Sequence, residues 1–423
     1  MINIIKYPEK ADWENVLQRP QLDNGTLLDS VAAILNDVKQ NADNAVKKYC
    51  RQFDEADLED LAVGADEWEA ANEIPYELKT AIQQAAANIK AFHKNQVGTI
   101  EVIETMPGIK CWRKSVAIDK VGLYIPGGSA PLFSTVLMLG IPAQIAGCKE
   151  IILCTPVAKD KKVHPAILYA AQLCGITKIY KVGGVQAIAA MAYGTETIMQ
   201  VYKIFGPGNR YVTAAKQLIQ QQGIAIDMPA GPSEVCILAD ETAPAAFVAA
   251  DLISQAEHGA DSQVLLISTD EKMIDEVTEE LKKQMELLPR KKIATQALQN
   301  SKCILVKDIA EAVAITNEYA SEHLIICCKN AIAIANEITN AGSVFIGNFS
   351  PESVGDYASG TNHVLPTNGF AKAYSGVSVD SFTKKITYQQ LDYKGLQNIS
   401  ATVITMAEAE GLQGHANAVK IRL

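Results

Sequence analysis

The fold is indicated first by the stretch Val121-Gly-Leu-Tyr-Ile125, which ends at Pro126-Gly127-Gly128. A short apolar run closed by Gly and Pro is typical of a buried strand followed by a turn. Three later runs end in the same way, at residues 151–154, 179–182 and 204–205. An Ala-rich, helix-like stretch follows each run, and strands that alternate with helices predict a parallel sheet covered on both faces.

The same alternation repeats in the second half of the chain. Apolar runs occur at residues 234–238, 264–267, 303–306, 324–327 and 344–346, and helix-like stretches near 244–257, 272–287, 309–318 and 331–339. This pattern predicts a second α/β unit. The intervening segment Asp227-Met-Pro-Ala-Gly-Pro-Ser-Glu234 contains two prolines and a glycine, which suit a crossing between units, so we place a domain boundary there.

The two ends of the chain follow other patterns. From about Asp29 to Asn95, apolar residues recur at three and four positions among Ala, Gln, Lys and Glu, which predicts several amphipathic helices. The segment from Tyr374 onward is polar and helix-prone with few strand signals. We expect it to form an arm or a small appended domain.

Composition excludes several classes of protein. A chain of 423 residues that is 48% hydrophobic can form two or three compact units. Its 38 basic and 48 acidic residues give a net charge of -10, and no basic stripe with interleaved aromatics is present, which argues against nucleic acid as a partner. No apolar run reaches the roughly 20 residues that span a bilayer, and the acidic start resembles neither an export nor a transit signal. We therefore expect a cytoplasmic protein without a membrane partner.

The nine cysteines are scattered, and no C-x-x-C occurs. This spacing argues against a thiolate zinc site and against a dithiol redox pair. We expect reduced cysteines that act as small hydrophobic residues.

Four of the six histidines lie in short clusters with acids and amides. These clusters are Gln255-Ala-Glu-His258, Glu322-His323, Asp356 with His363, and Glu410 with His415. Imidazole and carboxylate bind borderline cations and also move protons near neutral pH, so the clusters suggest a metal site coupled to acid and base groups. The other two, His93 and His164, lie in charged, helix-like surroundings and are expected at the surface.

Each cluster has a simpler explanation as well. Gln255 and His258 share one face of an expected helix and can hold one ion together, but a polar helix end stopped by Gly259 explains them equally. Asp356 follows the run 344–346, where binding loops of α/β folds lie, yet Asp is also an ordinary turn residue. Glu322-His323 suits a general base beside a carboxylate, or a solvated connection between elements.

Three glycine loops follow strand-like runs, at residues 126–129, 183–184 and 206–209. Their backbone amides can approach a pyrophosphate, but none has the G-x-G-x-x-G spacing, and ordinary turns explain them as well.

Longer motifs resemble those of the histidinol dehydrogenase family. The two principal ones are Asp227-Met-Pro-Ala-Gly-Pro-Ser-Glu-Val235 and Ala250-Asp-Leu-Ile-Ser-Gln-Ala-Glu-His258. The stretches 122–134, 321–323, 355–357 and 359–366 and the pair Glu410 and His415 are similar in the same order. The resemblance covers nearly the whole chain.

The resemblance implies an α/β fold with two Rossmann-like, incomplete doubly wound domains, a helical N-terminal region and a C-terminal arm. We expect an N-terminal arm of residues 1–20, a domain of residues 21–118 plus 233–373 with the metal and catalytic motifs, a domain of residues 119–232 with the cofactor loops, and an arm of residues 374–423 exchanged within a homodimer.

The implied reaction is the NAD- and zinc-dependent four-electron oxidation of L-histidinol to L-histidine through a bound aldehyde, the last step of histidine biosynthesis. The residues that match zinc ligands, which also hold the substrate, are Gln255, His258, Asp356 and His415. His323 matches the general base and Glu322 the residue that activates water. Further substrate contacts match Ser233, His323, His363 and Glu410, and NAD contacts match Tyr124, Gln186 and Asn209.

Two other functions fit the same residues. A zinc hydrolase would use Glu322 beside a metal-bound water, and a non-catalytic metal- or imidazole-binding protein would need no base beside an acid. Manganese or cobalt also suits an oxygen and nitrogen site of this kind.

Overall fold

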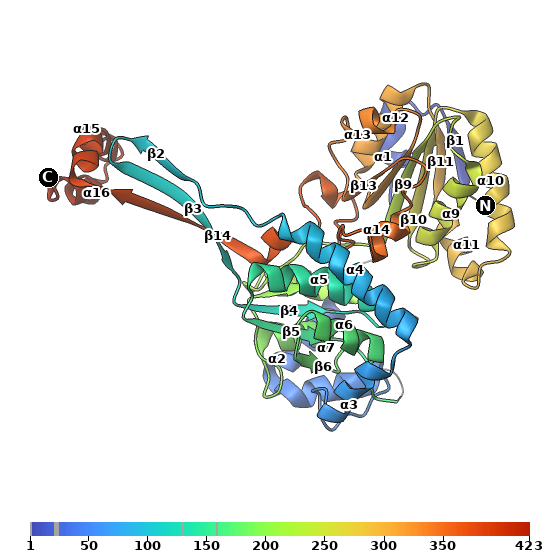
Figure 1. Ribbon diagram of the computed structural model, residues 1–423, viewed down its shortest axis with the longest axis horizontal. Helices are drawn as coiled ribbons and strands as arrows, with labels where there is room; N and C mark the ends of the chain where they lie inside the picture. The colour runs from blue at the N-terminus through green and yellow to red at the C-terminus, as the bar shows by residue number, and fades with distance from the viewer. Residues whose placement is uncertain (1, 21–24, 128–130, 158–159) are drawn as a thin grey trace.

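The computed structural model describes residues 2–20, 25–127, 131–157 and 160–423. The described chain forms two helix-covered parallel sheets and a long projecting arm (Figure 1). Within the described residues, no helix combines the length and apolarity needed to cross a membrane.

The first parallel sheet has the strand order β6-β5-β4-β7-β8. Its strands are β4 (Lys120–Tyr124), β5 (Glu150–Cys154), β6 (Lys178–Tyr180), β7 (Lys203–Phe205) and β8 (Ala225–Ile226). One face packs on α4 (Tyr76–Lys94), α5 (Phe133–Ala146) and α6 (Pro165–Leu173), and the other on α2 (Gly25–Phe53), α7 (Gly184–Tyr193) and α8 (Arg210–Gln220). The short helices α3 (Ala65–Glu69) and η2 (Ala70–Glu73) lie between α2 and α4 in the chain.

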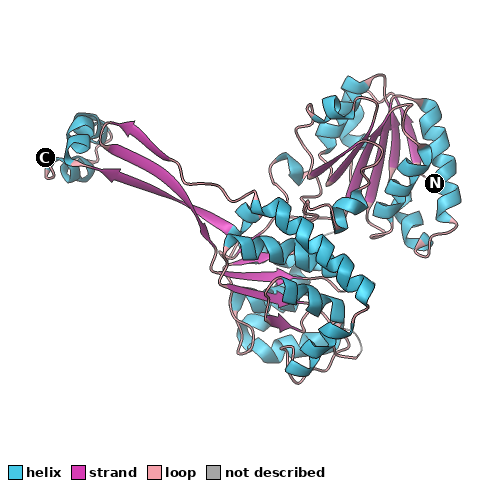
Figure 2. Ribbon diagram, viewed as in Figure 1, coloured by secondary structure: helices cyan, strands magenta, loops and turns pink. Residues whose placement is uncertain are grey.

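The second parallel sheet has the order β1-β11-β10-β9-β12-β13. Its strands are β1 (Asn3–Lys6), β9 (Glu234–Ala239), β10 (Gln263–Ser268), β11 (Lys302–Leu305), β12 (His323–Cys327) and β13 (Ser343–Ile346). On one face lie α9 (Ala245–Ala256), α10 (Glu271–Met285) and α11 (Lys291–Gln299), and on the other α1 (Trp13–Val16), α12 (Ile309–Tyr319) and α13 (Ala331–Ala335). Alternate residues of β9 enter the two cores, so both faces of the sheet are buried. Figure 2 shows helices on both sides of this sheet.

The arm is built from segments far apart in the sequence. Strands β2 (Val102–Met106), β3 (Ile109–Ala117) and β14 (Thr383–Leu391) form an antiparallel sheet, and α15 (Tyr393–Ala409) and α16 (Gln413–Lys420) form its tip with the C-terminus (Figure 1). The remaining elements are η1 (Lys10–Asp12), α14 (Glu352–Tyr357), η3 (Phe370–Lys372) and η4 (Val379–Phe382).

The predicted α/β class with two parallel sheets is confirmed, but three segments belong elsewhere than we expected. Strands β2 and β3, expected within the domain of residues 21–118 plus 233–373, form the arm with β14. Helices α2 and α4 pack on the two faces of the sheet of residues 120–226, because their apolar stripes enter its two cores. Helix α4 also contacts the second unit, where Asn88 donates to the Ala358 carbonyl at 2.8 Å. We expected an N-terminal arm of residues 1–20, but its described part, residues 2–20, forms no free arm, since β1 pairs with β11 and Leu17 is buried in the second unit.

Candidate functional site

A cavity of about 600 Å³ is lined by residues from both α/β units. The loop 206–209 after β7 contributes one wall. Seven further residues selected from the sequence line the same cavity, namely Ser233, Gln255, His258, Glu322, His323, Asp356 and His363. Three of the four clusters that are scattered along the sequence therefore meet in one place.

The cavity residues of the second unit do not lie at the carboxyl ends of its strands, where we expected them. Glu234 and His323 are the first residues of β9 and β12, so the cavity lies at the amino ends of these strands. We expected Asp356 at the carboxyl end of β13, but α14 carries it back to His323. The first unit follows the carboxyl-end rule of α/β folds, because Pro126, the loop 206–209 and Asp227 come after β4, β7 and β8 and all line the cavity.

His323 is almost fully buried between two carboxylates. Its Nε2 lies 3.2 Å from Oδ1 of Asp356, and its Nδ1 lies 3.2 Å from the carbonyl oxygen of Glu234 and 3.6 Å from Oε2 of Glu322. Burial acts to lower the pKa of His323, but the charges of Glu322 and Asp356 outweigh it and hold this pKa well above its usual range. The same contact lowers the pKa of Asp356 although burial acts to raise it.

Hydrogen bonds from neighbouring groups hold the imidazole of His363 and the carboxyl group of Glu352. His363 lies 2.8 Å from the Asp356 carbonyl through Nδ1 and 3.1 Å from the Thr135 hydroxyl through Nε2. Glu352 is buried and accepts a hydrogen bond of 2.7 Å from Ser254. Burial raises the pKa of Glu352 to about 8. Neither Thr135 nor Glu352 could be identified from the sequence, because neither lies in a His cluster.

Gln255 is held so that a cation can share its amide oxygen. In the orientation that satisfies both ends of the amide, the nitrogen donates to Glu352 Oε1 and the oxygen accepts from the Glu234 N–H, each at 3.0 Å. An amide oxygen has two lone pairs, so one remains for a metal. Within the described residues, no three His, Cys, Asp or Glu side chains are grouped as a metal would require. Gln255, His258 and Asp356 fit part of a zinc site that needs another ligand.

The wall formed by the loop 206–209 is held rigidly. Gly206 has φ +129°, and a Cβ atom there would lie 2.0 Å from the carbonyl oxygen of Tyr124, so only glycine fits. Its N–H donates to Asp227 and its carbonyl accepts from Lys216, each at 2.8 Å, while Lys216 and Asp227 form a buried ion pair. Asn209 caps α8 at the cavity.

Two predicted cofactor contacts lie outside the cavity lining. The Tyr124 hydroxyl accepts from the Gly184 N–H at 3.1 Å, and Gln186 donates to Asp54 at 3.2 Å. Oε1 of Gln186 is buried without a hydrogen-bond partner in the described part of the chain. An orphaned acceptor of this kind fits a ligand that brings a donor. In the loop 126–129, Gly128 and Ser129 lie outside the described residues.

Glu410 and His415 do not line the cavity of their own chain. Both are exposed at the tip of the arm, Glu410 at the end of α15 and His415 in α16. Of the two expected surface histidines, His164 is exposed but His93 is fully buried, where its Nδ1 lies 2.9 Å from the Ile89 carbonyl.

Comparison with known proteins decides the family. The family model described as histidinol dehydrogenase matches residues 17–423. The chain belongs to the histidinol dehydrogenase family. The histidinol dehydrogenases of Bacteroides fragilis and Bacteroides thetaiotaomicron are 59% and 57% identical to it, each over 100% of this chain and 99% of the relative. This family member is therefore an oxidoreductase.

A solved structure of the same family has the same fold. The crystal structure of histidinol dehydrogenase from Elizabethkingia anophelis superposes with a TM-score of 0.97 at 54% identity, covering 100% of this chain and 98% of the other.

Replacing Asp251 by Asn should stabilise the protein near neutral pH. Asp251 lies on α9 with 8% of its surface exposed, and burial raises its pKa to about 6. Because the pKa of this carboxyl is higher in the folded than in the unfolded protein, its contribution to stability is fully present below the unfolded pKa and is lost as pH rises through 6. At pH 7 the charged carboxylate therefore lowers the free energy of unfolding by about 3 kcal/mol. We expect Asp251→Asn to raise the free energy of unfolding by roughly 1–3 kcal/mol at pH 7.5 and little at pH 4. Urea unfolding at both pH values checks this, and equal changes at both would contradict it.

Proposed function

We propose that this histidinol dehydrogenase family member oxidises L-histidinol to L-histidine with two molecules of NAD, in the last step of histidine biosynthesis. One observation carries the proposal. Glu322 and His323, a candidate acid and base from adjacent positions, meet Asp356 in the cavity that also contains Gln255 and His258. Family membership supplies the substrate.

The side chains suit a two-stage oxidation. The Glu234 carbonyl engages Nδ1 of His323, so Nε2 is the nitrogen that takes the hydroxyl proton of the substrate. NAD supplies the hydride acceptor in both stages. In the second stage, the Glu322 carboxylate removes a proton from the water that adds to the aldehyde carbon. Ser233 and His363 line the cavity and are placed to orient the substrate.

Gln255, His258 and Asp356 would hold a zinc ion, with His415 as a further ligand. When bound, zinc supplies a template for the imidazole and amino nitrogens of the substrate and a positive charge that lowers the pKa of His323 toward neutrality. Tyr124, Gln186 and Asn209 would contact NAD. The orphaned Oε1 of Gln186 and the rigid loop 206–209 support this assignment.

A homodimer would supply the missing residues. We propose that the arm of each chain brings Glu410 and His415 to the cavity of its partner. The tip of the arm supports this, because Met406 and Ile421 expose 60% and 71% of their surface there. Apolar side chains exposed together in this way are typical of an interface.

Histidinol turnover by the metal-replete protein should yield two NADH per substrate. Chelation should abolish the activity, and zinc should restore it, because both stages use the site that contains Asp356. The measurement is absorbance of reduced nicotinamide at limiting histidinol. One NADH per substrate would contradict the role of Glu322, and none would contradict the proposed reaction and favour a hydrolase or a binding protein.

A further inference from the structure

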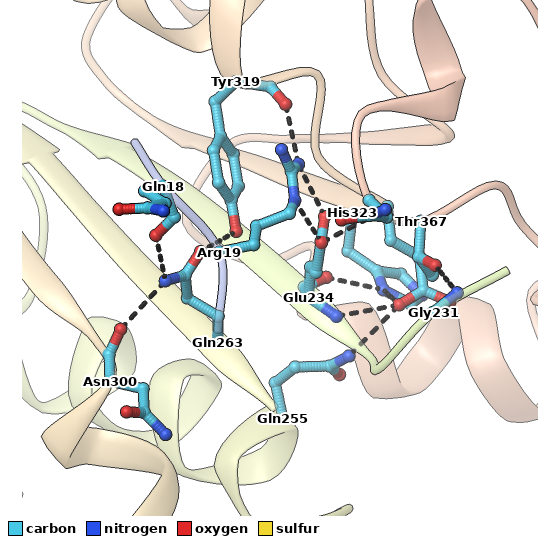
Figure 3. Close-up of polar contacts among 12 residues, drawn as sticks. Gln18, Arg19, Gly231, Glu234, Gln255, Gln263, Asn300, Tyr319, His323 and Thr367 are labelled. Atoms are coloured by element: carbon cyan, nitrogen blue, oxygen red, sulfur yellow. Dashed lines mark hydrogen bonds and ion pairs between the residues drawn. The ribbon is translucent and has the colours of Figure 1, made fainter. Parts of the chain in front are cut away.

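Arg19 and Glu234 form a buried ion pair beside the proposed site (Figure 3). The guanidinium donates from Nε to Oε1 and from Nη2 to Oε2 of Glu234, the latter at 2.9 Å. Only 18% of the Arg19 side chain and 3% of the Glu234 side chain are exposed. A two-bonded fork fixes both the distance and the plane of the carboxylate, which a single bond from lysine cannot do.

Further contacts hold this pair from several sides. The guanidinium lies 4.1 Å from the ring centroid of Tyr319 and donates to the Tyr319 carbonyl at 2.7 Å. The Tyr319 hydroxyl donates to Gln263, whose amide donates to the carbonyls of Gln18 and Asn300. The Asn368 N–H donates to Oε1 of Glu234 at 3.0 Å. The network therefore joins the segment before α2 to the start of β9.

The backbone of Glu234 contacts three residues of the proposed site. Its N–H lies 2.9 Å from Oε2 of Glu322 and, in the satisfied orientation of the amide, 3.0 Å from the oxygen of Gln255. Its carbonyl lies 3.2 Å from Nδ1 of His323. A displacement of this single residue would therefore move the acid, the base and a proposed metal ligand together.

We propose that Arg19 is a positioning residue that holds Glu234 so that its backbone aligns Glu322 and His323 for both oxidation stages. This inference rests on the proposed function of those two residues. Removal of Arg19 leaves a buried carboxylate without its cation, and the large desolvation cost drives the start of β9 toward another arrangement. Small displacements of reacting groups cost large factors in rate.

The test compares wild type with Arg19→Ala, and with Arg51→Ala as control, because Arg51 pairs with Asp57 at an exposed site. We expect kcat per folded Arg19→Ala protein to fall about 10–100-fold while KM for histidinol changes less than about threefold. Millimolar guanidinium should restore much of the lost kcat, whereas NaCl at equal ionic strength should not. Wild-type kcat in Arg19→Ala, or equal recovery with NaCl, overturns the proposal.

The number of NADH molecules formed per histidinol distinguishes a positioning role of Arg19 from a general loss of stability. A displaced Glu322 activates water poorly, so the aldehyde escapes and NADH per histidinol falls below the wild-type value in Arg19→Ala. An unchanged ratio together with unchanged kcat per folded protein overturns the proposal. If Arg19→Ala does not fold, Arg19→Lys carries the test, with an expected loss of about tenfold in kcat because the fork is lost; wild-type kcat in that variant overturns the proposal. Wild-type protein that makes no NADH would instead contradict the proposed function.

Discussion

Replacing His323 by Ala is expected to lower kcat for NADH formation from histidinol by about 10²–10⁴-fold, the usual contribution of a positioned general base. His323 lies with Nδ1 against the Glu234 carbonyl and Nε2 against Asp356, so an alanine leaves no imidazole to take the hydroxyl proton. KM should change much less, because Ser233 and His363 still line the cavity. Steady-state kinetics at saturating NAD provide the measurement.

A second histidine supplies the control for this experiment. His164 is exposed and caps α6 by accepting a hydrogen bond from the Ala166 N–H. It does not line the cavity. His164→Ala should keep the wild-type kcat and lose only about 1 kcal/mol of stability with the cap. A His323→Ala variant whose kcat stays within tenfold of wild type would show that another group is the base.

The second large effect concerns a residue outside the cavity of its own chain. His415→Ala is expected to abolish activity and weaken zinc binding, because the cavity holds too few ligands without it. Mixed with His323→Ala and refolded together, the inactive protein should regain about a quarter of wild-type activity. Half of the dimers then contain one chain of each variant. In each such dimer, one cavity combines the unchanged His323 of the His415→Ala chain with the unchanged arm of the His323→Ala chain.

A control for this recovery of activity combines two variants that both change cavity residues and leave the arm unchanged. His323→Ala refolded with Asp356→Ala should stay inactive, since both changes lie in the two α/β units that receive the arm and every cavity keeps a lesion. Activity in this control would show repair by another route. Failure of the His323→Ala and His415→Ala pair, despite mixed dimers identified by tags, would contradict exchange of the arm.

The buried strands could be predicted from the sequence because a short, continuous apolar run is typical of a strand that is covered on both faces. All nine expected apolar runs overlap strands of the two parallel sheets. Strand β14 could not be predicted in this way, since its sequence TKKITYQQL is mostly exposed and carries no apolar period. The stripes of α2 and α4 showed that these helices pack, but not on which sheet, because a stripe does not specify its partner.

The site was predictable where its residues lie in local clusters, and less so where they meet across the fold. Glu322 and His323 are adjacent in sequence, and the structure places them in one cavity with Asp356. The Glu234 backbone and the buried Glu352 carry no local sign of their contacts. His93 was misjudged because its charged neighbours Lys90 and Lys94 are exposed, while its own ring is buried and contacts the Ile89 carbonyl.

Pairing of β1 with β11 affects the order in which the chain matures during synthesis. Asn3 is paired with Lys302, so a ribosome that adds roughly 5–20 residues per second makes the first strand about 15–60 s before its partner emerges. All strands of the sheet 120–226 appear within that interval. The unit that contains the N-terminus is thus the one that is completed later, and its first strand stays exposed to chaperones and proteases until then.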